Sequence, residues 1–364
     1  MTYARSRLLV GITAVGTWVV ICIAFLAAGG ASLLPDADAS AGTQAGLLFA
    51  VLGAYVLVSL PFDLLGGLVL PRRHGRAVAS TGAYLAGWLR GVVVQVVVMA
   101  AAAALIVLAG SAGGTGAGLA VAAGIALVIA LGRLPLARAV AALGPPVAMD
   151  GAAGTVTIAA ADVGFTGGVT GLSGRVTMPA AWRDALGDGL QVELARRRSQ
   201  AGASYWLGIV VALAWTVGGV AVSMALPGGG AGDMSALVAT GAWFTLWSFV
   251  GLLVLPSVSR PAVRAADAAA AAAFPHDQVA AVISSLDALQ DDEPERPDAV
   301  EAIFHPIPGA GGRIAALGTP PPGPRPWNVA RTALPMSWCC LGLLGRAVHC
   351  NAGRPELWVL LPTD

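Results

Sequence analysis

Residues 91–132 read GVVVQVVVMAAAAALIVLAGSAGGTGAGLAVAAGIALVIALG and contain no Asp, Glu, Lys or Arg. A helix that spans a bilayer needs about 20 predominantly apolar residues, because lipid offers its backbone no hydrogen-bond partner. The uncharged run is about twice that length, which is enough for two spans. The glycines of GSAGGTG, at 110–116, interrupt it and are typical of a tight turn. The run therefore predicts two transmembrane helices, over about 87–109 and 117–137.

The rest of the chain is similarly apolar. Of its 364 residues, 57% are hydrophobic and 11% are charged, and the mean hydropathy is +0.77. Soluble domains carry about 25% charged residues, so the lipid bilayer is the expected partner of this surface. A net charge of +1 lacks the basic field that a nucleic-acid partner requires. Further spans are predicted over about 8–28, 46–70, 203–226 and 235–256.

The positions of the arginines give an orientation for these six spans. Cytoplasmic loops of membrane proteins accumulate positive charge. The arginines cluster before the first span, between the second and third, after the fourth, before the fifth and after the sixth: 5–7, 72–76, 133–138, 196–198 and 260–264. Six spans with both termini in the cytoplasm place every cluster on one side. We therefore expect a multi-pass protein of a bacterial inner (cytoplasmic) membrane.

Two polar regions are then left on the cytoplasmic side. In the first, GTVTIAA and GRVTMP carry β-branched residues next to glycines, which predicts a short hairpin over about 154–179. A helix follows it, with Asp188 as its expected N-cap. The second region begins with an Ala-rich helical stretch and continues through a Pro-rich linker, 318–326. The apolar block after the linker is too short to span between its arginines. We expect it to pack in the cytoplasm or at the membrane interface.

The helix after the predicted hairpin has the frame of a zinc-peptidase helix. Residues 189–200 read GLQVELARRRSQ, so Val192, Glu193 and Arg196 stand where His-Glu-x-x-His would have its first His, its Glu and its second His. This helix leads into a predicted span, and a second span follows. SRPAVRAAD, at 259–267, and FHPIPGAGGRIAAL, at 304–317, come after that second span.

This order of parts resembles the HtpX-like and CaaX-prenyl-protease-like membrane zinc metallopeptidases, family 48 of the metallopeptidases. The resemblance runs from before the hairpin to about residue 317. Ser259, Arg260, Ala266 and Asp267 match the second motif, which ends in Ala-Asp. His305-Pro306 and Arg313-Ile314-x-x-Leu317 match the later signature. The resemblance implies a metallopeptidase-like domain over 145–317. It does not explain the two flanking regions, which we expect to be an N-terminal four-helix membrane region, 1–144, and a Pro-rich linker with a C-terminal cytoplasmic block, 318–364. The expected fold class is an α-helical polytopic membrane protein of about six transmembrane helices with a small α+β cytoplasmic metallopeptidase-like domain.

The resemblance also implies three zinc ligands, and this chain has none of them. Val192 and Arg196 replace the two histidines, and Val263 replaces the Glu that is the third ligand of the family. Valine has no lone pair, and a guanidinium is always protonated, so zinc is not an expected cofactor. Glu193, the general-base position, and Asp267, a supporting position, remain. We expect an inactive peptidase homologue that binds, scaffolds or regulates, with a membrane protein or a second copy of itself as partner.

Glu193 has two interpretations at this stage. It can pair with Arg196 or Arg197 on its own helix, or with Arg264 across the former cleft. It can equally be an ordinary carboxylate on the surface of a helix.

Two other candidate sites lie outside the resemblance. Cys339, Cys340, His349 and Cys350 occur in one short block and are metal-ligand types, although buried free thiols are the better interpretation. Asp63 lies inside a predicted span, where a buried carboxylate marks a functional hypothesis such as a transporter or channel. The simpler expectation is that Pro61 breaks the helix and Asp63 lies near Arg72 or Arg90. An active peptidase with non-standard metal ligands is a further alternative.

Overall fold

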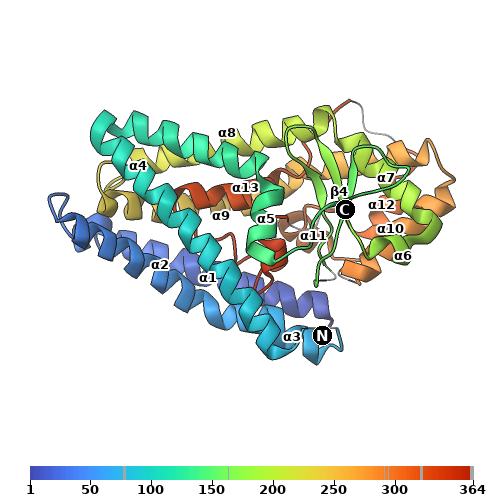
Figure 1. The fold of residues 1–364 in the computed structure, drawn as a ribbon, viewed down its shortest axis with the longest axis horizontal. Coiled ribbons are helices and arrows are strands. Elements are labelled where there is room, and N and C mark those ends of the chain that lie inside the picture. Colours follow the sequence, from blue (N-terminus) through green and yellow to red (C-terminus); the bar gives the residue numbers. More distant parts are fainter. Residues whose placement is uncertain (77–78, 163, 291, 294, 320–322, 361–364) are drawn as a thin grey trace.

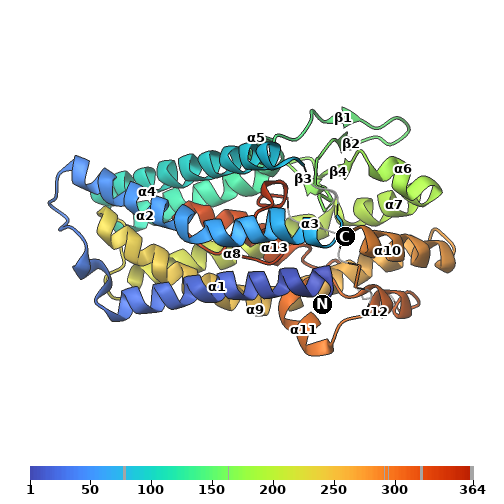
Figure 2. The same ribbon diagram turned by 90° about the horizontal axis from the view of Figure 1, so that it is seen from below.

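The computed structural model describes residues 1–76, 79–162, 164–290, 292–293, 295–319 and 323–360, so part of the Pro-rich linker, 320–322, lies outside the described residues. The chain is mostly helical and carries one small mixed sheet. The long helices lie lengthwise beside one another at one end of the molecule (Figure 1). The sheet and the short helices α6 (Trp182–Leu186), α7 (Leu190–Gln200), α10 (His276–Gln290) and α12 (Ala310–Ala315) lie at the other end, as the turned view in Figure 2 also shows.

Five helices of the described chain are long and apolar enough to cross a membrane, judged by length and composition. The second of them joins α2 through a π-helical turn, Leu65–Val69, to the short α3. Their bounds are α1 Tyr3–Ala27, α2 Ala41–Leu64 with α3 Leu70–Arg73, α4 Thr81–Leu131, α8 Ala203–Ala225 and α9 Met234–Ala271. The apolar stretches predicted from the sequence therefore do form long helices.

The predicted turn between the third and fourth spans lies inside α4. Gly114 has φ 76° and ψ −179°, so it is not helical, and two helices meet there at a sharp kink. Only glycine adopts such angles readily. Figure 1 shows the two limbs of α4 meeting at this point and diverging from it as a V. The Gly-rich turn expected at 110–116 is confirmed. The second limb leads into α5, Arg133–Ala141.

Pro61 does not break its helix, contrary to expectation. It lies within α2, which continues for another turn to Leu64 before the π-helical turn begins. A proline inside a helix removes one backbone hydrogen bond, and neighbouring side chains and turns of wider pitch can accommodate the loss in a membrane helix. Asp63 therefore remains part of α2, and the helix fixes the direction of its side chain.

The sheet has the order β1-β2-β4-β3. β3 and β4 are antiparallel neighbours, so the predicted hairpin forms in its second half. The expectation that GTVTIAA would pair with GRVTMP as a hairpin is wrong, because β2 and β4 are parallel. Parallel neighbours need a crossover connection, and the chain between these two strands supplies it while also forming β3. The strands are β1 Val147–Ala148, β2 Thr155–Ile158, β3 Gly168–Thr170 and β4 Arg175–Pro179.

Two short helices of the described chain lie between the sheet and α8, and three more lie between α9 and the Pro-rich linker. The expected cap by Asp188 is wrong, because this residue lies in a 3₁₀ turn, Gly187–Gly189, and the N-cap position of α7 is Gly189. The prediction of a helix around Glu193 is confirmed by α7. These five short helices are α6 Trp182–Leu186, α7 Leu190–Gln200, α10 His276–Gln290, α11 Asp298–Phe304 and α12 Ala310–Ala315.

The C-terminal block lies inside the helix bundle, and this corrects the expectation of a peripheral element. α13, Val329–Met336, packs against α8 and α9, and the 3₁₀ helix that follows it, Ser337–Cys340, packs against α4. Figure 1 and Figure 2 both show α13 among the long helices. A last 3₁₀ turn covers Pro355–Leu357. The block carries the fully buried Trp338 and Trp358.

Glycines on the long helices admit this irregular segment. A Cβ on Gly208 would overlap the carbonyl oxygen of Trp327, and a Cβ on Gly67 would overlap that of Gly353. Side chains of the long helices also form hydrogen bonds with the backbone of the C-terminal block. The hydroxyl of Thr245 on α9, for example, accepts from Leu343 N at 3.3 Å. Non-helical backbone is tolerated between membrane helices only where protein buries and satisfies it. A window of hydropathy along the chain does not register such close contacts.

Candidate functional site

The two motif helices of the sequence analysis meet in the structure. α7 packs against α9, whose C-terminal part carries Asp267. α10 packs against α7, α9 and α12, and so brings α12 close to the other two helices. Together they bury five charged side chains, none more than 5% exposed. We call this group the ion cluster: Glu193, Arg196 and Arg197 from α7, Asp267 from α9 and Arg313 from α12. Motifs far apart in the sequence thus form one site.

Arg196 links the two carboxylates of the ion cluster. Its Nε donates to Asp267 Oδ1 at 2.8 Å, and its Nη1 donates to Glu193 Oε2 at 2.5 Å. The other oxygen of Glu193 accepts from Arg197 Nε at 2.6 Å. Arg313 binds Asp267 with two nitrogens, at 2.9 and 2.8 Å. Such bidentate pairs fix geometry as well as charge.

Arg197 also ties the ion cluster to the sheet. Its Nη1 donates to the carbonyl oxygen of Thr177 on β4 at 3.2 Å. The guanidinium lies 5.0 Å from the ring centroid of Trp182 on α6, within range of a cation–π contact. The cluster therefore joins the sheet, α6, α7, α9 and α12 into one body.

The charges around Glu193 keep it ionised. Burial alone would raise the pKa of this carboxyl, but the guanidiniums of Arg196 and Arg197 hold it below its ordinary value. Because both oxygens already accept hydrogen bonds from guanidinium groups, Glu193 is a weak proton acceptor. Two expectations are settled here: the pairing with Arg196 and Arg197 is confirmed, and the surface carboxylate is wrong. Arg264 is exposed on α9, and it is Arg313 that contacts Asp267.

The residues at the ligand positions do not fit zinc. A catalytic zinc needs three nitrogen, sulfur or oxygen ligands and an open position for water. Val192 and Val263 are buried and present only methyl groups, and the guanidinium of Arg196 lies between the two acids. A cation already fixed between them would repel a divalent ion. The chain's own arginine thus supplies the positive charge that balances these carboxylates.

The Cys and His residues of the C-terminal block are spread over different surroundings. Cys339 and Cys340 are buried in the 3₁₀ helix against α4, and Cys350 Sγ donates to Asn351 Oδ1 at 3.3 Å. The ring of His349 lies 5.2 Å from that of His305, between centroids. In the described part of the chain, no three His, Cys, Asp or Glu side chains come together in a group able to hold a metal ion. All four thiols are buried, and none of these described cysteines forms a disulfide bond.

Asp63 is buried, and its partner is not one of those expected. Its Oδ2 pairs with Arg346 of the C-terminal block and accepts from Trp88 Nε1 at 3.0 Å, while Oδ1 accepts from the backbone N of Gly353 at 2.9 Å. The expectation of Arg72 or Arg90 is wrong. Both donate elsewhere to backbone carbonyls, Arg90 to Ala139 O at 2.9 Å. The cation comes instead from the inserted segment.

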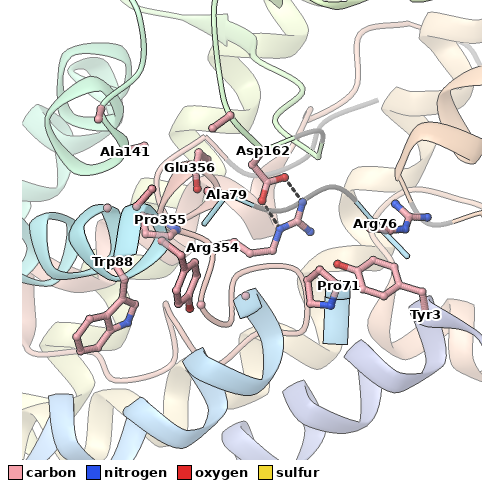
Figure 3. Close-up of a pocket in the computed structure, with 17 residues that line it drawn as sticks. Tyr3, Pro71, Arg76, Ala79, Trp88, Ala141, Asp162, Arg354, Pro355 and Glu356 are labelled. Carbon is pink, nitrogen blue, oxygen red and sulfur yellow. Dashed lines mark hydrogen bonds and ion pairs between the residues drawn. The ribbon is translucent and has the colours of Figure 1, made fainter. Parts of the chain in front are cut away.

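A cavity of about 250 Å³ lies where the C-terminal segment meets the loop after β2. Figure 3 shows Asp162 and Arg354 facing each other there, and Arg354 Nε donates to Asp162 Oδ2 at 2.6 Å. Burial, together with the charge of Asp162, raises the pKa of Glu356, a third member of the wall, to about 7. Tyr3 and Arg76 stack at the opposite side, 4.4 Å from guanidinium carbon to ring centroid.

The sequence contained partial signals for the residues that were missed. Arg346 is the one Asp, Glu, Lys or Arg residue between positions 332 and 353, and such a charge in an apolar stretch needs a buried partner. Asp63 is the acid inside a predicted span that could provide it. Arg313 belonged to the later signature, yet its contact with Asp267 depends on how α12 and α9 pack. No pattern in the loop around Asp162 indicated Arg354.

No protein-family model, no curated protein and no solved structure matches this chain.

Proposed function

We propose that this chain is a catalytically inactive homologue of the HtpX-like and CaaX-prenyl-protease-like membrane metallopeptidases, and that it binds, scaffolds or regulates another membrane protein. One observation carries the proposal. The guanidinium of Arg196 donates to Glu193 and Asp267, the two acids that the motif frame retains. A peptidase helix of this kind would have a metal ligand at the position of Arg196.

The chemistry of the ion cluster supports binding rather than hydrolysis. Hydrolysis by this type of site needs a metal-activated water and a carboxylate free to accept its proton. Glu193 gives both oxygens to guanidinium groups, and the two valines offer nothing to a metal. A satisfied buried network instead holds the surrounding helices in one arrangement. We infer that the former catalytic frame now acts as a rigid support.

The proposal includes a bacterial inner membrane, six passes and cytoplasmic termini. The arginine clusters support this orientation, because they fall on one side if the chain crosses six times. The kink at Gly114 supports the count, since it divides α4 into two limbs. Cysteine labelling from either side of inverted and right-side-out vesicles tests it. A label in the 110–116 turn that reacts only from the cytoplasmic side would contradict six passes.

Zinc binding tests the assignment of the ligand positions. The purified wild-type chain is expected to hold far less than one equivalent of zinc after a mild chelator wash. The variant Val192→His/Arg196→His/Val263→Glu restores the three ligand types and is expected to take up zinc. It leaves each carboxylate one guanidinium, because Arg197 still pairs with Glu193 and Arg313 with Asp267.

The control for that variant keeps the spacing but changes the face of the helix. Gln191→His/Ala195→His puts two histidines four residues apart on the less buried side of α7. Stoichiometric zinc in the washed wild-type chain would overturn the inactive assignment. Equal zinc uptake by the restored variant and the control would overturn the resemblance to a metallopeptidase frame.

Crosslinking in native membranes tests the binding role. A photoreactive residue at the exposed Arg183 of α6 or Arg264 of α9 is expected to give one discrete adduct. Two differently tagged copies of the chain distinguish self-association from a heterologous membrane protein. If neither position gives an adduct at native expression level, the scaffolding role fails even where the zinc result holds.

A transporter or channel that uses Asp63 is the alternative. Such a role needs a carboxylate that exchanges a proton or an ion with a water-filled path. Both oxygens of Asp63 are instead held by Arg346, Trp88 and Gly353. A peptidase with unusual ligands is the other alternative, and it requires a metal-binding group outside the motif frame. The geometry of both sites favours the binding role.

A further inference from the structure

A recess of about 300 Å³ lies on the flank of the bundle between α1 and α9. We call it the lateral groove. One wall is the first half of α1 and the other is the middle of α9, while α11 and the C-terminal block close its inner side. Its wall residues include Gly11, Val15 and Gly16 of α1 and Phe249, Leu252 and Pro256 of α9.

The lateral groove faces the lipid in the proposed orientation. Both of its walls belong to helices apolar enough to cross a membrane. Large apolar side chains stand exposed beside it, with Leu9 50% and Ile12 41% exposed on α1 and Leu253 40% exposed on α9. One end of it lies next to Arg5, Arg7 and Arg260, at the level of the lipid headgroups in the proposed topology. From there it extends along α1 to Gly16 and along α9 to Phe249, toward the hydrocarbon interior.

The inner end of the lateral groove is basic. Arg331 of α13, which is 7% exposed, and His349 form this part of the wall. None of the described residues that line the groove is Asp or Glu. A guanidinium matches a phosphate by charge and by its planar fork of donors. The groove thus combines an apolar channel with a cationic end.

We propose that the lateral groove binds one acyl chain of an anionic glycerophospholipid, with the lipid phosphate at Arg331. The volume is near the lower limit of small-molecule sites, about 300 Å³, and so suits one chain rather than a whole lipid. A helix of a protein partner is about 10–12 Å across and does not fit a recess of this size. The apolar wall takes the chain, and the charge of Arg331 selects the headgroup.

Gly16 offers a way to fill the lateral groove without disturbing its walls. A Cβ built on this residue meets no heavy atom within 4 Å. Gly16→Phe is therefore expected to occupy the groove while the bundle stays folded. Gly53→Phe is the matched control, because Gly53 on α2 also faces open space and lies outside the groove.

The experiment uses the full chain in lipid nanodiscs with phosphatidylglycerol that carries a photoreactive group in one acyl chain. Adducts mapped by mass spectrometry are expected at 8–16 and 249–256. Gly16→Phe is expected to lower labelling at these segments several-fold, and Gly53→Phe is expected to leave it unchanged. Equal labelling of the wild type and Gly16→Phe, or uniform labelling of all long helices, would overturn the proposal.

A second comparison tests the cationic end. The wild type is expected to label more strongly with the phosphatidylglycerol probe than with a phosphatidylcholine probe of the same chain. Arg331→Gln is expected to lose that preference and to keep acyl labelling, whereas Arg264→Gln, on an exposed part of α9, keeps both. No preference in the wild type, or displacement of the probe by free palmitate rather than by unlabelled phosphatidylglycerol, would contradict a phospholipid occupant.

Discussion

Arg346 forms an ion pair with Asp63, which lies 283 positions earlier in the chain, inside the bundle of long helices. Both side chains are at most 1% exposed. The guanidinium also lies 4.6 Å from the ring centroid of Trp358 and donates to Gln95 Oε1 at 3.4 Å. The pair therefore fastens the inserted C-terminal block to the first half of the chain.

Removal of the cation from this pair is expected to destabilise the whole bundle. Arg346→Met leaves Asp63 buried without a countercharge, a change that costs about 3–5 kcal/mol. Asp63→Asn/Arg346→Met removes the stranded charge and is expected to recover part of the loss. Thermal unfolding in detergent measures both. Arg72→Met, at an exposed arginine, is the control. If the double variant melts no higher than Arg346→Met, the pair is not the cause.

The ion cluster is expected to carry a similar share of the stability. Glu193→Gln leaves Arg196 and Arg197 with one carboxylate fewer in a fully buried site, again at a cost of about 3–5 kcal/mol. Asp184→Asn, at an exposed acid on the neighbouring α6, is expected to change little. The midpoint of thermal unfolding separates these outcomes. Equal midpoints for the two variants would show that the Glu193 pairs add nothing to folding.

Close approach of two backbones predicts a strong glycine requirement at 353. Gly353 has φ +68°, and a Cβ there would overlap the carbonyl oxygen of Asp63. Gly353→Ala combines both penalties and is expected to cost well over about 1 kcal/mol. Gly53→Ala meets open space on a helix and is expected to stabilise by up to about 1 kcal/mol. Opposite shifts of the unfolding midpoint would verify the inserted position of the block.

Glu356 predicts a pH dependence that its own substitution removes. Its pKa is raised from 4.5 to about 7 in the folded chain, so the folded state binds more protons than the unfolded state between these values. Stability linked to Glu356 is therefore full below the unfolded value, falls as pH rises through this window, and stays low above it. Glu356→Gln is expected to abolish this fall in the unfolding midpoint. An unchanged pH profile in the variant would assign the effect to another group.

Glu193 has the opposite sign. Its pKa is lowered in the folded chain, so its contribution is present at neutral pH and is lost only as pH falls below the ordinary carboxyl range. The difference in midpoint between the wild type and Glu193→Gln is therefore expected to shrink in acid. A difference that stays constant down to acid pH would mean that the charge of Glu193 is irrelevant to the cluster.

Local features of the sequence determined much of the architecture. The long apolar runs predict membrane-spanning helices because each such helix satisfies its backbone within itself. The glycines around Gly114 predict the turn in α4, since they adopt angles that other residues avoid. The spacing of Val192 and Arg196 places both on one helical face, which was enough to exclude zinc ligation there. Each of these conclusions needs only residues that are close together in the chain.

The tertiary structure alone decided which distant groups meet. The parallel pairing of β2 with β4, the contact of Arg313 with Asp267 and the insertion of the C-terminal block join segments with no local pattern in common. Buried charge explains the second and third of these contacts, because the buried carboxylates of Asp267 and Asp63 each need a cation close by. The sequence by itself established that the long helices are apolar and that Val192, Arg196 and Val263 cannot act as zinc ligands. Packing decided that arginines, one from the far end of the chain, would balance the buried acids.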